Sequence, residues 1–599
     1  MSLPDMVLTV FEREALAEVS KVRCWEHVEW FAGVGEKLSG TPANERTVDY
    51  VLDRLKGYGV KASAPAFQAW LDFPNPSEAE LRVLSPEKRD IRAMPLAQAA
   101  PTPPEGVEGE LVYVGGGGLR DYEGVDARGK VVLAEFSKPP ARPWKNYVAG
   151  IIKGAVGMIV IGYTGPTMVY NWGTVKSVWG NPTLDDIDEI GRIPVLLISA
   201  EDGQQLKGLL GKEAVRVRMK AGSRRGWAAT RQPMATISGR ELGFVLLGSH
   251  LDSWRGAASC NAVGCASTLE SARVLSRLRS SLRRGVEFLW FQGHETGIMT
   301  GSTWYVDNHW DRLHTGCVAY LNNDTPSMIG TTVYSAEADP VLQQFVWSTV
   351  AELAEEEGAP IRKPPTKYLP NKTGDQSFYG VGVPSVRVIT VHPPEERVPP
   401  GGWWYHSDQD TLDKCDPDTL HMANKAQILV ILRLCTLPVL PYKVQATADW
   451  TLDTLKQLRA SAGGALDLTG LVGKVEVFKN AASSLDEATA LLSERCQDSK
   501  EAERLEKEVR LTNENLLKIC RVLNPINYTL HGKYGQDHYG AEYIKPIPLL
   551  QPVSELVALD PDTSEYKALK TKLVRARNIV SDALEEVTRV ARSTSDKLG

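Results

Sequence analysis

Short apolar runs alternate with longer helical patterns through the middle of the chain. Residues 244–247, 286–291 and 318–322 are apolar runs with the length of buried parallel strands. Residues 262–278 carry small and apolar side chains three and four positions apart, as a helix packed on a sheet does. Strands that alternate with helices indicate a mostly parallel sheet with helices on both faces, so we expect an α/β fold here.

The stretch before these strands has a different pattern. Pro and Gly become dense after residue 100, which marks a boundary or a loop. Beyond it, β-branched runs at residues 110–114 and 130–135 predict strands, and a Gly- and Ala-rich segment at 149–157 predicts a helix before a strand at 158–161. We expect an inserted, β-rich module that ends near residue 222.

The last part of the chain has a long helical periodicity. Residues 446–591 are rich in Leu, Ala, Glu, Lys and Arg, and residues 566–591 carry a clear apolar stripe. We interpret this part as a helical bundle. Such a stripe is usually core, but a bundle at the end of an enzyme also commonly serves as a dimer surface.

Length and composition agree with several soluble domains. At 599 residues the chain is too long for one hydrophobic core. An apolar content of 43%, a charged content of 24% and a net charge of −6 are typical of globular proteins and give no reason to propose DNA, RNA or an anionic membrane as partner. We predict an α/β domain at 1–97 and 223–445, an inserted domain at 98–222 and a helical domain at 446–599.

From the sequence we expect no secretory signal and no membrane-spanning segment. Its first residues lack a basic stretch followed by a long apolar one, and the most apolar segment, 149–163, contains Lys153 and four glycines and is too short to span a bilayer. The eight cysteines include no CxxC pair, which favours reduced thiols. We therefore expect a cytoplasmic protein.

Histidine and acidic residues follow the predicted strands. They occur at residues 248–252, 293–295 and 322–324, directly after the three apolar runs, and at 405–407 in a loop rich in Gly and Trp. Each alone is typical of a surface or hydrogen-bonded residue, but the carboxyl ends of parallel strands meet at one edge of a sheet. Imidazole and carboxylate groups are the usual ligands of zinc and similar ions. Asp252, two residues after His250, is placed to orient that ring.

These segments resemble those of the M28 metallopeptidases. The matching motifs are GSHLDSW at 248–254, NAVGCASTLESARVL at 261–275, FQGHETGIMTGS at 291–302, NND at 322–324 and YHS at 405–407. Residues 98–222 are similar to a protease-associated (PA) insert, and the tail is similar to the dimerisation domain of the transferrin receptor and glutamate carboxypeptidase II branch. The resemblance implies the zinc-exopeptidase fold, a divalent transition metal, with zinc as the expected ion, and a homodimer formed through the C-terminal helices.

The resemblance also implies a ligand set from which this sequence departs twice. It implies that His250 and Asp324 hold one metal ion and that Glu295 and His406 hold a second. The family bridges the two ions with an aspartate and uses a glutamate as general base. Here Cys260 stands at the bridging position and His294 at the position of the base.

The two departures leave the metal chemistry open. Two divalent charges about 3.5 Å apart repel by roughly 19 kcal/mol at an effective dielectric constant near 20, and a carboxylate bridge offsets part of this with two oxygens. A thiolate bridges through one atom and longer bonds. Our hypothesis is that one ion is retained and that the dinuclear site is lost or remodelled, with Cys260 or His294 joining the ligands.

Three functions remain compatible with the sequence. The first is a metal-dependent hydrolase that acts on an amide or related bond of a small molecule or peptide, with His294 and Asp252 as catalytic residues. His294 suits proton transfer near neutral pH because the reference pKa of imidazole is about 6.5; it could also be a ligand. The second is a metal-assisted elimination or hydration, in which His294 abstracts a proton. The third is a catalytically silent scaffold that binds a partner.

Overall fold

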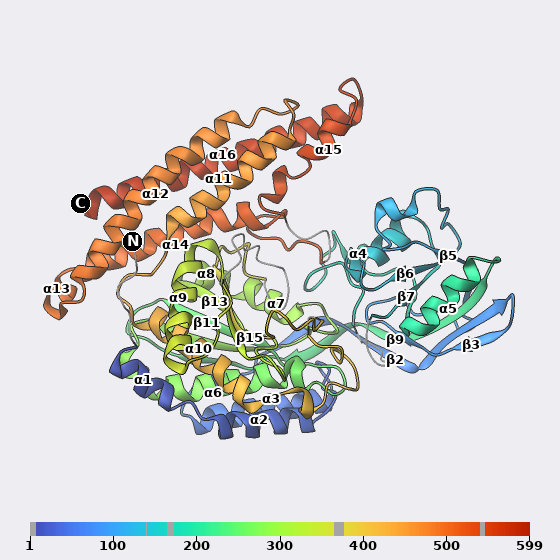
Figure 1. Ribbon diagram of the computed structural model, residues 1–599, viewed down its shortest axis with the longest axis horizontal. Coiled ribbons are helices and arrows are strands. Elements are labelled where there is room, and N and C mark those ends of the chain that lie inside the picture. Colours follow the sequence, from blue (N-terminus) through green and yellow to red (C-terminus); the bar gives the residue numbers. More distant parts are fainter. Residues whose placement is uncertain are drawn as a thin grey trace.

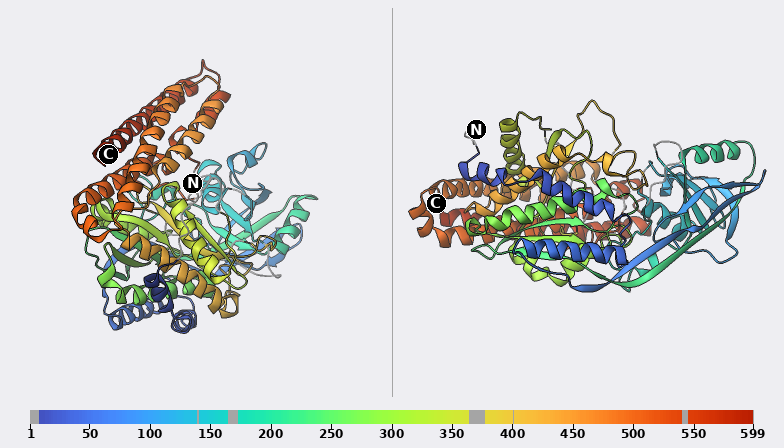
Figure 2. Two further views of the ribbon diagram at one scale, coloured as in Figure 1. Left: turned by 60° about the vertical axis from the view of Figure 1, so that its left-hand side comes forward. Right: turned by 90° about the horizontal axis from the view of Figure 1, so that it is seen from below.

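Two β-sheets and a bundle of helices form the protein (Figure 1). The computed structural model describes residues 8–138, 140–163, 173–363, 377–399, 401–539 and 545–598. The two sheets lie side by side, and the C-terminal helices cover one side of the first sheet (Figures 1 and 2).

The first sheet has seven strands in the order β1-β10-β12-β11-β13-β15-β14. The four strands from β12 to β15 in this order pair in parallel, while β1, β10 and β14 join antiparallel at the edges. The α/β fold predicted from the sequence is thereby confirmed. The strands are β1 (Lys61–Ser63), β10 (Met234–Ile237), β11 (Phe244–His250), β12 (Gly285–Phe291), β13 (Cys317–Asn322), β14 (Val333–Ala338) and β15 (Ser385–Val391).

The central strands are buried on both faces, which explains their continuous apolar runs. In β11, Val245 and Leu247 pack with one group of helices, and Phe244 and Leu246 pack with another. The first group comprises α1 (Val10–Ala17), α2 (Lys21–Gly33), α3 (Pro42–Gly57), α6 (Val263–Arg277), α9 (Pro340–Glu357) and α10 (Pro417–Thr436), and the second comprises α7 (Thr300–Asn308) and α8 (Trp310–Gly316).

The second sheet has eight strands in the order β3-β2-β9-β5-β6-β7-β8-β4. It starts at Ala66 rather than at residue 98, because the chain enters it along a long ribbon of two antiparallel strands, β2 and β9 (Figure 2). The strands are β2 (Ala66–Ser85), β3 (Arg89–Ile91), β4 (Ala93–Pro95), β5 (Val107–Tyr113), β6 (Val131–Glu135), β7 (Gly157–Ile161), β8 (Val195–Ile198) and β9 (Arg216–Arg231). We call this part the inserted lobe; it also carries α5 (Ala200–Leu210).

One helix of the inserted lobe differs from the prediction. The structure has α4 (Arg142–Tyr147), continued by a π-helical turn at Val148–Ile152, so the helix predicted at 149–157 is wrong in both bounds. Pro143 favours an earlier start because proline fits the first helical turn. Gly154, with φ of +69°, takes a left-handed conformation that stops the helix.

The C-terminal lobe consists of helices, as its periodicity predicts. They are α11 (Val444–Ser461), α12 (Thr469–Arg495), α13 (Ser499–Arg504), α14 (Glu506–Tyr528), α15 (Val553–Ala558) and α16 (Ser564–Leu598). Apolar stripes of α12 and α16 pack together, while α14 faces the first sheet (Figure 1). Among the described residues, no helix combines the length and apolarity needed to cross a bilayer. The predicted homodimer and the predicted cellular compartment stay predictions.

Candidate metal centre

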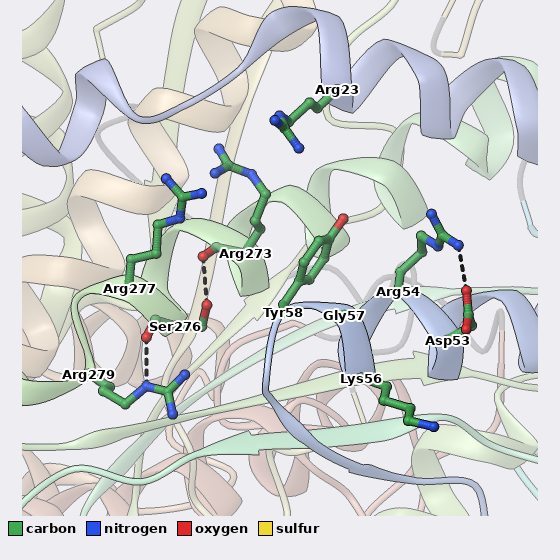
Figure 3. A pocket seen from close by; sticks show the side chains of 10 residues that line it. All are labelled: Arg23, Asp53, Arg54, Lys56, Gly57, Tyr58, Arg273, Ser276, Arg277 and Arg279. Carbon is green, nitrogen blue, oxygen red and sulfur yellow. Dashed lines mark hydrogen bonds and ion pairs between the residues drawn. The ribbon is translucent and has the colours of Figure 1, made fainter.

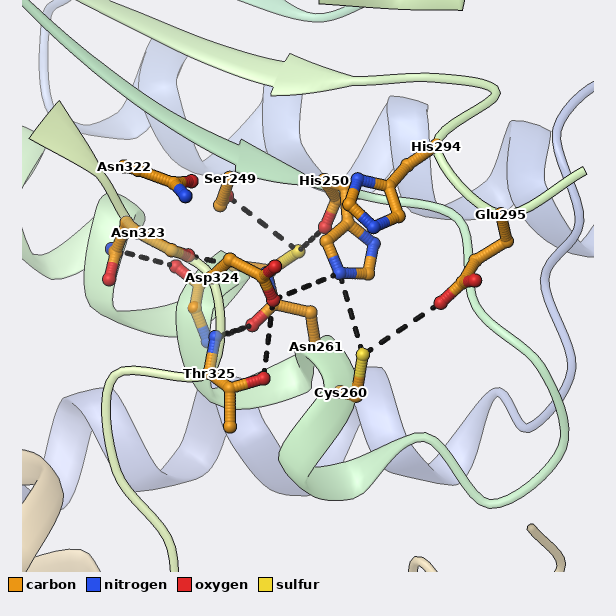
Figure 4. A network of polar contacts seen from close by, with 12 residues as sticks. Ser249, His250, Cys260, Asn261, His294, Glu295, Asn322, Asn323, Asp324 and Thr325 are labelled. Atoms are coloured by element: carbon orange, nitrogen blue, oxygen red, sulfur yellow. Dashed lines mark hydrogen bonds and ion pairs between the residues drawn. The ribbon is translucent and has the colours of Figure 1, made fainter. Parts of the chain in front are cut away.

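Five residues singled out from the sequence converge at the carboxyl edge of the first sheet. Figure 4 shows four of them, His250, Cys260, Glu295 and Asp324. His250 ends β11, Glu295 follows β12 and Asp324 follows β13. Two residues come from outside the strands: Cys260 from the irregular turn at Ala258–Ala262 that precedes α6, and His406 from a loop beyond β15. We call these five residues the metal cluster. All are buried except Asp324, which is partly buried.

The metal cluster consists of two groups of three that share one sulfur. In the first, Nε2 of His250 lies 3.4 Å from Oδ1 of Asp324 and 3.6 Å from Sγ of Cys260. In the second, Sγ of Cys260 lies 3.5 Å from Nε2 of His406 and 3.8 Å from Oε1 of Glu295. The last two atoms are 3.0 Å from each other.

These separations fit the ligands of a divalent ion. Zinc binds sulfur at about 2.3 Å and nitrogen or oxygen at about 2.0–2.2 Å, so two ligand atoms of one tetrahedral ion lie roughly 3.3–3.6 Å apart. Both groups come close to this spacing without any rearrangement. Their mixture of imidazole, carboxylate and thiol also suits zinc. Cys260 therefore lies where one ligand atom can serve both groups.

Asp410 positions the turn that carries Cys260. One of its oxygens accepts hydrogen bonds from the backbone N and Oγ of Ser259, at 2.8 and 2.7 Å, and the other accepts from the backbone N of Cys260 at 3.1 Å. Burial raises the pKa of the Cys260 thiol well above its usual value, and the charges of Glu295, Asp324 and Asp410 raise it further. The metal-free thiol is therefore protonated, and a bound ion has to displace that proton.

Asn261, next to Cys260, ties the turn to the strand end that carries Asp324. Its Oδ1 accepts from the backbone N of Thr325 at 3.1 Å, and its Nδ2 donates to the carbonyl oxygen of Asn323 at 3.3 Å (Figure 4). The position of Cys260 relative to Asp324 is thus set by backbone contacts as well as by the ligands themselves.

Asp252 has a different role from the one predicted. Its carbonyl oxygen, rather than its carboxylate, contacts Nδ1 of His250 at 2.8 Å and orients the ring. The carboxylate accepts instead from the backbone N of His294 at 3.1 Å and of Glu295 at 3.0 Å. Burial raises the pKa of Asp252, although His250 and His294 oppose the rise. Asp252 therefore holds the segment that carries two predicted site residues.

The environment keeps the two carboxyl groups of the metal cluster ionised. Burial acts to raise the pKa of Glu295, but the charge and hydrogen bond of His406 outweigh it and lower the pKa to about 2. The pKa of Asp324 is also held below its usual range, because the hydrogen bond and charge of His250 outweigh the effect of burial. Trp254 donates from Nε1 to the second oxygen of Glu295 at 2.8 Å, which fixes this carboxylate.

His294 lies beside the metal cluster. Its ring stacks on that of His250, with 3.8 Å between centroids and 13° between planes. His294 is 6% exposed, and a nitrogen of its ring lies within ligand distance of His250 and Glu295. The structure thus brings His294 to the same site, in a position from which it can exchange protons or bind an ion.

The inserted lobe holds the loop that follows Glu295. We call residues 293–299 the site loop. The carbonyl oxygen of Thr296 accepts from the backbone N of Asp72 at 3.2 Å and from Nε2 of Gln98 at 2.5 Å. The carbonyl of Gly297 accepts from Nζ of Lys176 at 2.7 Å, and that of Ile298 from the backbone N of Gly180 at 2.7 Å.

The site loop needs this support because its backbone is strained. Ile298 and Met299 have φ angles of +51° and +61°, which side chains other than glycine rarely adopt. Sequence reasoning missed the residues that hold it, since Gln98 and Lys176 lie far away in the chain and in no motif. Asp410 could have been found, because it follows His406 by four residues in the same loop.

Comparison with known protein families gives a match over the strands β10 to β15 of the first sheet. The profile of peptidase family M28 matches residues 234–431, which include all five residues of the metal cluster. The match begins at β10, directly after the ribbon of the inserted lobe.

Curated relatives extend the similarity over more of the chain. The chain is 27% identical over 526 residues to a probable glutamate carboxypeptidase of Zea mays, covering 72% of this chain and 70% of that protein. It is 22% identical over 405 residues to carboxypeptidase Q of Bos taurus, covering 65% of this chain and 80% of that protein.

Solved structures show the same fold. A peptidase M28 precursor from Shewanella amazonensis superposes with a TM-score of 0.56 at 20% identity, covering 71% of this chain and 96% of that one. The zinc aminopeptidase BSAP of Bacillus subtilis superposes with a TM-score of 0.54 at 19% identity, covering 70% and 95%.

Proposed function

Since residues 234–431 belong to peptidase family M28, we propose that the protein is a metal-dependent hydrolase that cleaves an amide bond in a peptide or a related small molecule. The relatives named as carboxypeptidases support the reaction class.

The observation that carries the proposal is the sharing of Cys260 by two groups of three ligands. Its sulfur lies between 3.5 and 3.8 Å from His250, Glu295 and His406. A thiolate here has the same charge as the aspartate that the resemblance implies, so it can offset the same repulsion between neighbouring cations. We therefore propose a remodelled site in which Cys260 bridges two ion positions, one beside His250 and Asp324, the other beside Glu295 and His406.

The chain's own groups would divide the remaining work. A divalent ion held here would act as a Lewis acid that polarises the carbonyl group of the substrate. His294 would accept the proton of the attacking water and pass it to the leaving amine, because neutral imidazole is a competent base near pH 7. Asp252 would keep His294 and Glu295 in place through their backbone N–H groups.

Metal analysis together with activity tests this proposal. We expect the protein, purified after growth in zinc-supplemented medium, to contain close to two zinc ions per chain by mass spectrometry, and Cys260→Ser to contain at most one. Cys265→Ser is the matched control, since that buried thiol donates to the carbonyl oxygen of His250 and lies in neither group. A wild-type protein without stoichiometric metal would contradict the proposal. One zinc ion per chain in both the wild type and Cys260→Ser would reject Cys260 as a bridge between two ions.

Activity is then measured on aminoacyl and carboxyl-terminal peptide substrates with and without zinc. Hydrolysis that depends on zinc and is lost in His294→Ala, while metal content stays unchanged, supports His294 as the proton-transfer residue. Loss of metal in the same variant would instead make His294 a ligand.

A further inference from the structure

A hollow of about 690 Å³ opens in the α/β lobe at the far end of α6 from the metal cluster (Figure 3). Cys260 precedes the first residue of α6, and Arg277 is its last, so roughly 20 Å of helix separates the two places. Ten residues from α2, α3, α6 and the segments that follow α3 and α6 line it: Arg23, Asp53, Arg54, Lys56, Gly57, Tyr58, Arg273, Ser276, Arg277 and Arg279. We call this the cationic hollow.

The hollow has a surplus of positive charge. Six of its ten lining residues are Arg or Lys, and Asp53 is the one acid among them. Glu18 and Glu270 pair with Arg273 and Arg277 from outside the lining. Six cations against these three carboxylates leave three positive charges in one place, on a chain whose formal net charge is −6. Like charges gathered in this way favour an anionic ligand.

Several of the guanidinium groups are held in place before any ligand arrives. Arg273 is 4% exposed and donates from Nε and Nη2 to Glu270 at 2.8 and 2.6 Å. Arg279 donates from Nε to the carbonyl oxygen of Ser276 at 2.8 Å. Figure 3 shows that Arg23, Arg273 and Arg277 extend toward the same space. Fixed guanidinium groups lose little entropy when they bind a phosphate or carboxylate.

The ends of helices explain only part of this arrangement. Arg54 and Lys56 lie in the last turn of α3 and Arg277 in the last turn of α6, where cations stabilise the helix dipole. Arg23 lies in the first turn of α2, where a cation is unfavourable and where no acidic residue compensates it. Its guanidinium has neither a hydrogen bond nor an ion pair with any residue that the structure describes. Helix stability therefore gives no reason for Arg23 to face the hollow.

Besides burial, the positive charges of the hollow lower the pKa of the neighbouring His27. Burial, together with the charges of Arg54, Arg273 and Arg23, lowers its pKa from 6.5 to about 4. Its Nε2 lies 2.9 Å from the hydroxyl of Tyr58, which lines the hollow. A neutral His27 that accepts this hydrogen bond keeps the hydroxyl in place at the wall.

We propose that the cationic hollow is a binding site for a small phosphorylated molecule with at least two phosphoryl groups. Guanidinium groups bind phosphoryl oxygens in pairs of parallel hydrogen bonds, and several groups on different elements can grip a diphosphate from more than one side. The volume accommodates a diphosphate with an organic group attached. The proposal is independent of the proposed hydrolase activity, because the hollow and the metal cluster share no residue.

Calorimetric titration of the full-length protein with pyrophosphate tests the site. Each of the two arginines would lose charge-assisted hydrogen bonds to phosphoryl oxygens, so we expect Arg23→Gln with Arg277→Gln to weaken pyrophosphate binding by about a hundredfold or more. Arg459→Gln is the control, because it removes an exposed arginine from the last turn of α11 without touching the hollow. Its affinity should equal that of the wild type.

Two further arms separate the alternatives. Pyrophosphate also binds zinc, so the titration is repeated in Cys260→Ser, which should bind as the wild type does. Binding that survives in the double variant and disappears in Cys260→Ser would place pyrophosphate at the metal cluster and overturn the proposal. It is equally overturned if the wild type does not bind pyrophosphate, or if Arg459→Gln weakens binding as much as the double variant. Citrate is titrated in parallel; tighter binding of citrate would reject phosphoryl groups as the ligand chemistry.

Discussion

The two ends of α6 differ in nearly every physical respect. At its first turn, buried acids, imidazoles and a thiol crowd together, and each is fixed by several contacts. At its last turn, arginines from three elements surround an open hollow. The first end concentrates groups that need a cation to be compatible with one another, and the second concentrates groups that need an anion.

The difference shows how one helix can serve two kinds of electrostatic site. The crossover helix of an α/β fold begins at the carboxyl edge of the sheet and ends at the opposite edge. Its first turn therefore lies where catalytic groups gather, while its last turn favours cations. In this chain, α2 adds Arg23 to the cations at the last turn of α6. Arg23 does so although it lies in the first turn of α2, where the helix dipole disfavours a cation.

Removing metal should have the largest effect and should act at one end only. We expect a chelator to lower hydrolysis by about 10³-fold or more, because the ion stabilises charge that no side chain of the metal cluster can stabilise instead. Added zinc should restore activity. Pyrophosphate binding, measured in the same chelated sample by calorimetry, should stay unchanged; a parallel loss would mean that the two ends are not separate sites.

Restoring the ordinary family residues should change the chemistry of the first end. We expect Cys260→Asp combined with His294→Glu to raise hydrolysis of simple aminoacyl amides by about tenfold or more, because a carboxylate bridge supplies two oxygens where the thiolate supplies one sulfur. Initial rates over a range of zinc concentrations measure this. If the native protein already cleaves these amides as fast as the double variant, the two replacements did not divert the site.

Loss of the Asp252 carboxylate should weaken the first end without removing a ligand. In Asp252→Asn the backbone N–H groups of His294 and Glu295 lose a charged acceptor. We expect zinc affinity to fall by about 10- to 100-fold, as it does when a residue that supports metal ligands is changed. Competition with a fluorescent chelator gives the affinity. An unchanged affinity would show that Asp252 matters for folding alone.

A buried lysine that holds the site loop should make the stability of the protein depend on pH, whereas the cationic hollow should not. Burial lowers the pKa of Lys176 from 10.5 to about 7, so folding releases its proton between these two pH values. The unfolded chain binds more protons there, and the free energy of unfolding therefore rises with pH by about 1.4 kcal/mol per unit relative to Lys176→Met. Below pH 7 the lysine is charged in both the folded and the unfolded state. The difference in unfolding free energy between the wild type and Lys176→Met should therefore not change with pH there. The arginines of the cationic hollow keep their charge throughout.

Thermal unfolding of both proteins from pH 6 to pH 9 checks this. Lys479→Met, which removes an exposed lysine paired with Asp449, is the control and should show no such slope. Parallel pH curves for wild type and Lys176→Met would contradict the prediction.

The sequence was most informative where chemistry and periodicity coincide. The strands predicted at 244–247 and 318–322 are confirmed, although the first extends to His250, and so is the family resemblance, because apolar runs and motif residues lie next to each other in the chain. The predicted helix at 149–157 failed because Gly154 breaks the pattern locally. The contacts of Lys176 and Gln98 with the site loop could not be predicted, since they depend on how two sheets face each other.

The ribbon of β2 and β9 makes the inserted lobe a detachable unit. The chain leaves the first sheet at Ala66 and comes back at Arg231, and these two residues are direct partners in the ribbon. A short turn between Ala66 and Arg231 could therefore replace all the residues between them. The first sheet would not have to move to accept this deletion. Such a shortened chain would keep the ligands but free the carbonyls of residues 296–298, so the lobe acts as an external brace for the strained site loop.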